Sequence, residues 1–223
     1  MPDGVAREFV IAIDGPAASG KGTIATGLAR ELGVPVLDSG LLYRAVGVTL
    51  VQQGGDPADP AAAEAVARNL DTRSLENPAF RTREAGEAAS LVAAHPGVRQ
   101  ALVDFQRAFA AQDGGAVIDG RDIGTVIAPD APAKLFVTAS AEVRAERRHK
   151  QLVGQGEAVD YDDVLADIRR RDERDSARAA SPLVKADDAT LLDTTRMSIS
   201  QAADAARRIV DQARARWEAS RQG

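Results

Sequence analysis

Nine consecutive residues near the N-terminus have the types and spacing needed to bind the phosphates of a nucleotide. Two glycines frame most of the segment, and their backbone freedom lets successive N–H groups turn inward around an anion. The lysine after the second glycine can reach the β- and γ-phosphates, and the threonine two residues later is a candidate hydroxyl for Mg²⁺. The segment predicts a phosphate loop for ATP or GTP, made of Gly15, Pro16, Ala17, Ala18, Ser19, Gly20, Lys21, Gly22 and Thr23.

Two further polar segments, 38–44 and 119–125, each follow a short apolar run. Both should therefore emerge at the edge of a parallel sheet where ligands bind. In the first, Arg44 falls one helical turn into the next helix. In the second, Arg121 can hold a phosphate while the Asp122 carboxylate accepts a hydrogen bond from a base amine. The alternatives are a solvated surface role for Arg44, a helix cap for Ser39, and a turn in which Arg121 and Asp122 pair with each other.

A highly charged segment nearer the C-terminus offers a third group. Arg171, Asp175 and Arg178 are spaced i, i+4, i+7 and therefore share one face of a helix. A kinase for a phosphorylated acceptor must hold two phosphate groups in line, which requires several guanidiniums. The alternative is a solvated helix crossed by salt bridges, which is what we expect for the remaining charges of this segment.

The elements that must position these residues alternate along the chain. Short apolar runs predict strands, and helical periodicity predicts helices between them, including a charged helix over about 161–179. This rhythm is typical of a parallel sheet with helices on both faces, so we expect a three-layer α/β/α fold around a five-stranded parallel sheet. The expected strands are 9–13, 34–37, 116–119, 134–138 and 190–193.

The rhythm breaks between residues 54 and 96. Two short helical stretches are expected there, one opening at Asp59-Pro60 and one from about 82 to 94. An irregular connection near 75–78 joins them. We interpret 54–96 as an insertion into a core made of residues 1–53 and 97–223.

Composition limits the classes of function. The chain has 223 residues, 44% of them hydrophobic, which suits one core domain with a small insertion. A formal charge of −5 disfavours a general nucleic-acid binder. No cysteine is present, and neither a signal peptide nor a membrane span is recognisable, so we expect a cytoplasmic protein without membrane partners.

In combination these segments resemble bacterial cytidylate kinases, a family of phosphate-loop nucleoside-monophosphate kinases. The Gly-Lys-Gly-Thr form of the loop, in which Gly22 separates the lysine from Thr23, is similar to that group. The matching segments occur in family order across nearly the whole chain. They are Gly15–Thr23, Leu37–Arg44, Ala88–Ala94, Asp119–Thr125, and Arg171–Arg178 followed by Pro182-Leu183.

The resemblance implies three groups of acceptor contacts. The acceptor phosphate would be held by Ser39, Arg44 and Arg121. The cytosine would be surrounded by Ser90, Arg99 and Asp122. The ribose would be held by Arg171 and Asp175, with the base and phosphate region faced by Arg178.

The activity implied by the resemblance is transfer of the γ-phosphoryl group of ATP to CMP or dCMP, in pyrimidine nucleotide metabolism. Mg²⁺ would be the cofactor, bound through the phosphates near Thr23, with Asp119 a candidate to support it and Asp14 a competitor for that role. Residues 54–96 would bind the acceptor, a short lid at about 153–160 would cover ATP, and the protein would be a monomer. The charge that develops during transfer would be stabilised by Lys21, Arg44, Arg121, Arg171 and Arg178.

Two rival functions remain open on the sequence. A kinase of this architecture could act on UMP, AMP or a small metabolite such as shikimate. A GTP-dependent switch would carry an Asn-Lys-x-Asp motif that recognises guanine and an Asp-x-x-Gly switch motif, and neither is convincing in this sequence.

One departure from the family concerns residues 70–78. This segment is too short and irregular for the extra strands that are usual in the acceptor-binding part of the family.

Overall fold

The computed structural model describes residues 8–178 and 180–222, and at Ser74 the backbone only. The prediction that no signal peptide is present rests on residues 1–8, of which 1–7 lie outside the described residues. The predicted helix end at Ala179 lies outside them as well. Across the described residues, no helix is both long and apolar enough to cross a membrane.

Within the described residues, five strands form one parallel sheet, as the sequence predicts. The order across the sheet is β2-β3-β1-β4-β5, and the central strand pairs Ile13 with Asp119 on one side and with Leu135 on the other. β1 and β3 are buried along their whole length, which explains their continuous apolar sequence. The strands are β1 Val10–Asp14, β2 Val36–Asp38, β3 Ala116–Gly120, β4 Ala133–Thr138 and β5 Thr190–Asp193.

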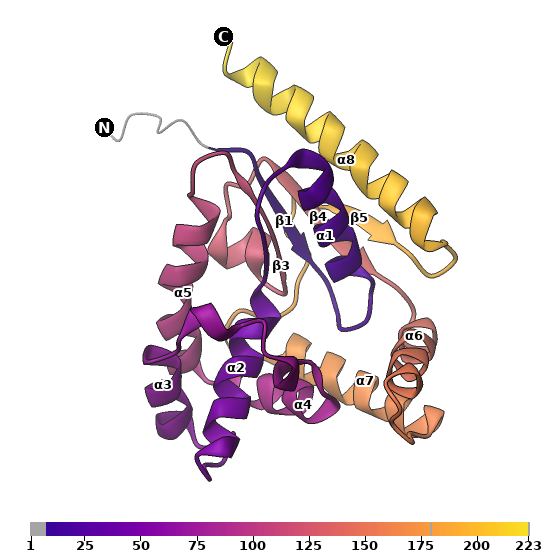
Figure 1. Ribbon diagram of the computed structural model, residues 1–223. Coiled ribbons are helices and arrows are strands. Elements are labelled where there is room, and N and C mark those ends of the chain that lie inside the picture. The colour runs from indigo at the N-terminus through magenta and orange to yellow at the C-terminus, as the bar shows by residue number, and fades with distance from the viewer. Residues whose placement is uncertain (1–7, 179, 223) are drawn as a thin grey trace.

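Helices cover both faces of this sheet (Figure 1). Alternate residues of β1 enter opposite cores, with Ile11 and Ile13 against α1 (Lys21–Leu32) and α8 (Ile199–Ser220). Val10 and Ala12 enter the other core, with α2 (Ser39–Gln52) and α5 (Pro96–Ala110). The three-layer α/β/α prediction is therefore confirmed.

The segment between α2 and α5 is helical in short pieces. It contains α3 (Pro60–Arg68), two 3₁₀ turns at Thr72–Ser74 and Pro78–Arg81, and α4 (Arg83–Val92). Within the described part of this segment no strand forms, in agreement with the irregular sequence around 70–78. α3 and α4 both pack on α2 and share its apolar core.

Two more helices follow β4. α6 (Ala141–Gly154) and α7 (Tyr161–Ala177) pack on each other through Ala145 and Ile168, and this small cluster also contacts Ala17 and Ala18 of the phosphate loop. α7 lies between α6 and α4, so these helices form a row beyond the sheet (Figure 1).

One local prediction is wrong. Ser39 does not cap α2, because it is the first residue of that helix and is buried. The cap is Asp38, whose carboxylate accepts the backbone N–H of Gly40 at 2.9 Å. Asp38 thus stabilises the helix N-terminus and leaves the Ser39 hydroxyl for the cleft described below.

Candidate active site

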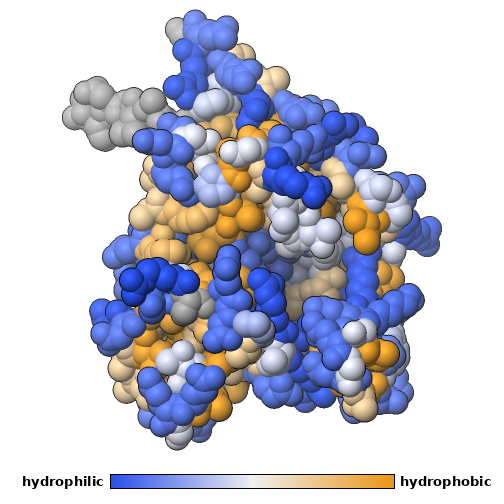
Figure 2. Space-filling view, in the orientation of Figure 1, coloured by the Kyte–Doolittle hydropathy of each residue, from blue (hydrophilic) through white to orange (hydrophobic). Residues whose placement is uncertain are grey.

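Two adjoining clefts open at the carboxyl ends of the strands, and Figure 2 shows this face hollowed between the sheet-bearing part and the lower helices. The larger cleft has a volume of about 680 Å³ and lies among α4, α6 and α7. The smaller has about 360 Å³ and runs from the phosphate loop toward α5. Most predicted site residues line the smaller cleft, namely Ala17, Ala18, Gly20, Lys21, Gly22, Thr23, Ser39, Arg44, Ser90, Arg99, Asp119, Arg121, Asp122, Arg171 and Arg178.

Four predicted residues do not line either cleft. Gly15, Pro16 and Ser19 lie behind the loop surface, and Asp175 is fully buried beneath the arginines. Asp175 therefore acts on the cleft only through the arginine side chains with which it pairs, Arg121 and Arg178.

The phosphate loop has the backbone geometry that an anion cradle requires. A Cβ at Gly15 would collide with the carbonyl oxygen of Val137, and Gly20 adopts a φ of 93°. Gly20 caps α1 without a side-chain hydrogen bond, so the first N–H groups of that helix are left for a ligand. The buried hydroxyl of Ser19 has no hydrogen-bond partner among the described residues. These features fit the phosphates of a nucleotide.

Two arginines that the sequence did not identify as site residues support this loop. Arg144 donates to the carbonyl oxygens of Ala17 and Ala139, at 3.3 and 2.8 Å, and to the carboxylate of Asp172 at 2.6 and 2.9 Å. Arg147 donates to the carbonyl oxygen of Ser19 at 3.3 Å. Both arginines follow the carboxyl end of the predicted strand 134–138, and this position at the ligand-binding edge of the sheet was the sequence signal that could have identified them.

Lys134, a residue of β4, is not a surface charge. Its side chain is buried, and its ammonium donates to the Asp188 carboxylate at 2.7 and 2.9 Å and to the carbonyl oxygen of Pro129. It lies in neither cleft and takes no part in the site.

Lys21 and Asp119 face each other at the end of the loop. The ammonium nitrogen lies 3.8 Å from the nearer carboxylate oxygen. Burial raises the pKa of Asp119, and it lowers the pKa of Lys21 with help from the charge of Arg121.

Asp14 has a different role from Asp119. Its carboxylate oxygens accept the backbone N–H groups of Ile123 and Gly124 at 2.8 and 2.7 Å. Burial outweighs these hydrogen bonds and raises the pKa of Asp14 to about 6. Both oxygens are thus engaged with the backbone, whereas Asp119 lies on the cleft wall beside Gly22 and Thr23.

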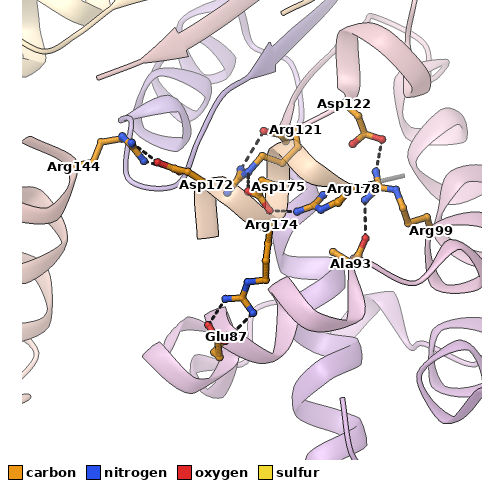
Figure 3. Close-up of polar contacts among 11 residues, drawn as sticks. Glu87, Ala93, Arg99, Arg121, Asp122, Arg144, Asp172, Arg174, Asp175 and Arg178 are labelled. Carbon is orange, nitrogen blue, oxygen red and sulfur yellow. Dashed lines mark hydrogen bonds and ion pairs between the residues drawn. The ribbon is translucent and has the colours of Figure 1, made fainter. Parts of the chain in front are cut away.

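Four of the arginines that line the smaller cleft are Arg44, Arg121, Arg171 and Arg178, and the last three lie near the buried carboxylate of Asp175. Arg121 donates to Asp175 at 2.7 Å, and Arg178 forms a second ion pair with the same carboxylate (Figure 3). Burial alone would raise the pKa of Asp175, but the nearby arginines outweigh it and lower the pKa to about 2. The side-chain hydrogen bonds of Asp175 come from Arg121 and Arg178, and among the described residues none comes from Arg171.

Arg44 and Arg171 form no salt bridge within the described residues, although the charges of Asp38 and Asp175, respectively, lie near them. Burial, followed by repulsion from Arg121, lowers the pKa of Arg171 to about 9, so it stays charged at neutral pH. Burial also lowers the pKa of Arg44, whose guanidinium donates to the carbonyl oxygen of Phe80 at 3.5 Å. The buried Nε atoms of Arg44 and Arg171 have no hydrogen-bond partner among the described residues. Such an excess of buried positive charge is costly unless an anion binds.

The far end of the cleft combines an acid and a hydroxyl. Asp122 forms a buried ion pair with Arg99, whose guanidinium also donates to the carbonyl oxygen of Ala93 at 3.3 Å (Figure 3). The buried hydroxyl of Ser90 has no hydrogen-bond partner within the described structure. Because Arg121 pairs with Asp175 and Asp122 pairs with Arg99, the alternative of a mutually paired turn is excluded.

Comparisons with known proteins agree with this geometry. The family model for cytidylate kinases matches residues 11–212. A cytidylate kinase from a Caulobacter species is 68% identical over 209 residues, which cover 94% of this chain and 97% of that protein. The cytidylate kinase of Xanthobacter autotrophicus is 66% identical over 207 residues, covering 93% and 99% of the two chains.

A solved structure supports the fold alone. An uncharacterised protein from Eubacterium ventriosum superposes with a TM-score of 0.55 at 17% identity, covering 92% of this chain and 99% of its own.

Proposed function

The chain belongs to the cytidylate kinase family and transfers the γ-phosphoryl group of ATP to CMP or dCMP, and we propose here how its residues divide that work. The observation that carries the proposal is the convergence of cationic side chains on one cleft that ends at a buried carboxylate. Five of these side chains would face the phosphates. Those five side chains are Lys21, Arg44, Arg121, Arg171 and Arg178.

The acceptor phosphate would bind between Arg44 and Arg121, with the Ser39 hydroxyl beside them. These groups line the same cleft, and a dianionic phosphate would supply the charge that Arg44 and Arg171 lack. Arg171 and the Arg121–Asp175–Arg178 group would hold the ribose and the phosphate from the α7 side.

The cytosine would lie at the far end, against Asp122, Arg99 and Ser90. Cytosine presents an amine donor where uracil presents a carbonyl oxygen, so an ionised carboxylate favours cytosine and repels uracil. The unpartnered Ser90 hydroxyl offers a further hydrogen bond to the base. This arrangement supports a preference for CMP and dCMP over UMP.

On the donor side, residues Gly15–Thr23 would hold the phosphates of ATP, and Lys21 would contact the β- and γ-phosphates. Mg²⁺ fits beside this loop, because the Thr23 hydroxyl and the Asp119 carboxylate both line the cleft and are oxygen ligands of the kind that Mg²⁺ prefers. When bound, Mg²⁺ would neutralise charge on the β- and γ-phosphates. Asp14 is excluded from this role in our proposal because its oxygens accept backbone N–H groups.

Catalysis would be positional and electrostatic. The second pKa of a phosphate monoester is near 6, so the acceptor is largely ionised at neutral pH and needs no general base. Lys21, Arg44, Arg121, Arg171 and Arg178 would stabilise the charge on the group in transfer.

We also propose the division of the chain into parts. Residues 54–96 would form the acceptor-binding insertion, residues 153–160 the lid over ATP, and 1–53 with 97–223 the core. The absence of cysteine from the sequence supports a cytoplasmic location. A monomer is our working proposal for the assembly, and sedimentation velocity would test it directly.

The test of the function is an assay of ADP release with ATP and Mg²⁺, comparing CMP, dCMP, UMP, AMP, GMP and shikimate as acceptors. We expect CMP or dCMP to give the highest kcat/KM. Arg121→Gln should reduce kcat/KM for CMP by about a hundredfold or more, whereas Arg169→Gln, whose side chain is 58% exposed, serves as a control and should not. Faster turnover of another acceptor, or ADP release no faster than without acceptor, would contradict the proposal.

A further inference from the structure

Two ion pairs join α4 to α7 beside the larger cleft, whose lining includes Arg83, Glu87 and Asp167. Arg83, the first residue of α4, donates from Nε to the Asp167 carboxylate at 2.9 Å. One turn further along α4, Glu87 accepts two parallel hydrogen bonds from Arg174, each 2.8 Å long (Figure 3). The second pair has the paired-fork geometry in which a guanidinium and a carboxylate fix each other's orientation.

The spacing of these pairs relates them to the acceptor site. Asp167, Arg171 and Arg174 are spaced i, i+4, i+7 and share one face of α7, so the two ion pairs flank Arg171. On α4, Gly86 approaches Arg171 so closely that a Cβ there would lie 3.6 Å from its guanidinium. Ser90 follows Glu87 by one turn on the same helix. The contact between α4 and α7 therefore sets how Ser90 of α4 lies relative to Arg171 of α7, and both residues line the acceptor cleft.

The Glu87–Arg174 pair differs from the surface salt bridges expected for this charged segment. Arg174 reaches a helix that lies 87 positions away in the sequence, and its side chain is 26% exposed, while that of Glu87 is 49% exposed. Arg169 offers a comparison on the same helix, since it makes one 2.9 Å hydrogen bond to Glu142 of α6 and both side chains are more than half exposed. Of the two pairs, Glu87–Arg174 is therefore the one built to hold two helices together.

We infer that Glu87 and Arg174 are positioning residues for the acceptor, and this inference rests on the function proposed above. Their ion pair holds α4 against α7, so that Ser90 from one helix and Arg171 from the other face the same bound CMP. Without the pair, acceptor binding must also order α4, and that cost falls on acceptor affinity. ATP binding at the phosphate loop and the chemical step in the filled site are left nearly unchanged.

The test is a double-mutant cycle made of Glu87→Ala, Arg174→Ala and the double variant, with Arg169→Ala as the matched control on α7. The readouts are KM for CMP, KM for ATP, kcat and the thermal midpoint of unfolding. We expect KM for CMP to rise roughly threefold to fivefold in each single variant, the range that a part-exposed ion pair supports. The double variant should show the same rise, because each single change already removes the interaction. KM for ATP, kcat and the control should stay within about twofold of the wild type.

Three results would overturn the inference. These are an unchanged KM for CMP, a rise in the double variant equal to the product of the single rises, or a fall in kcat at constant KM. A wild-type enzyme that does not turn over CMP would instead contradict the proposed function, and it would be detected before any variant is compared.

Discussion

The ammonium group of Lys21 lies 3.8 Å from the carboxylate of Asp119, and both side chains line the cleft where the phosphate loop meets the end of β3. This relationship places a positive charge next to the expected position of the transferring phosphoryl group. It also gives the lysine a counter-charge before any nucleotide binds.

Lys21→Met should lower kcat by about a hundredfold to a thousandfold, because it removes one charge aimed at the transferring group. The variant should still fold, since burial raises the pKa of Asp119 and its carboxyl can take up a proton when the ammonium is lost. Steady-state rates together with a urea unfolding curve check both points. A folded variant with kcat within tenfold of the wild type would contradict the role given to Lys21.

Asp14 should make stability depend on pH in a defined direction. Its pKa is raised from 3.8 to about 6 in the folded protein, so between these values the unfolded chain loses a proton that the folded protein keeps. The free energy of unfolding should therefore fall as pH rises from about 4 to 6, by about 3 kcal/mol from this group, and level off above that range.

Asp14→Asn removes this titration, so the difference in free energy of unfolding between wild type and variant should carry the same pH dependence. Urea unfolding at pH 4, 5, 6 and 7 would measure it, whatever constant offset the loss of one backbone hydrogen bond adds. A difference that stays constant over this range would show that Asp14 is ionised throughout.

The close approach of α2 and α4 depends on Gly47. A Cβ at this position would lie 2.7 Å from the Cβ of Ala88, so one helix must move. Gly47→Ala should cost about 1 to 3 kcal/mol of stability. Gly27→Ala is the matched control, because nothing lies within 4 Å of its added Cβ in α1.

The control should gain up to about 1 kcal/mol from the better helix propensity of alanine. Urea unfolding at one pH compares the two variants. Equal stability of Gly47→Ala and the wild type would mean that α2 and α4 are not packed this closely.

The positions of the strands along the chain and the phosphate loop were predictable from sequence because their signals are local. Buried parallel strands are continuous apolar runs, and the glycines and Lys21 lie within a few residues of one another. The choice between Ser39 and Asp38 as a helix cap was not predictable in this way, because either side chain can accept the hydrogen bond and only the position of the first turn decides.

Contacts between distant segments were the part that sequence could not supply. Arg144 acts on the loop carbonyl of Ala17, which lies 127 positions earlier, and Arg121 pairs with Asp175 rather than with its neighbour Asp122. Charge and spacing identified most of these residues as candidates. Their partners depend on how α6 and α7 pack over the sheet.

The most direct test of the site assignment is the ratio of kcat/KM for CMP to kcat/KM for UMP, measured for the wild type and for Asp122→Ala. Asp122 is 4% exposed and pairs with Arg99, so its loss can destabilise the protein. A urea unfolding curve of the Asp122→Ala variant must therefore be recorded to show that the variant is folded. We predict that the wild type prefers CMP and that the ratio falls by about tenfold to two-hundredfold in the variant. A folded variant that keeps the wild-type ratio would contradict the assignment of Asp122 as the group that recognises the base.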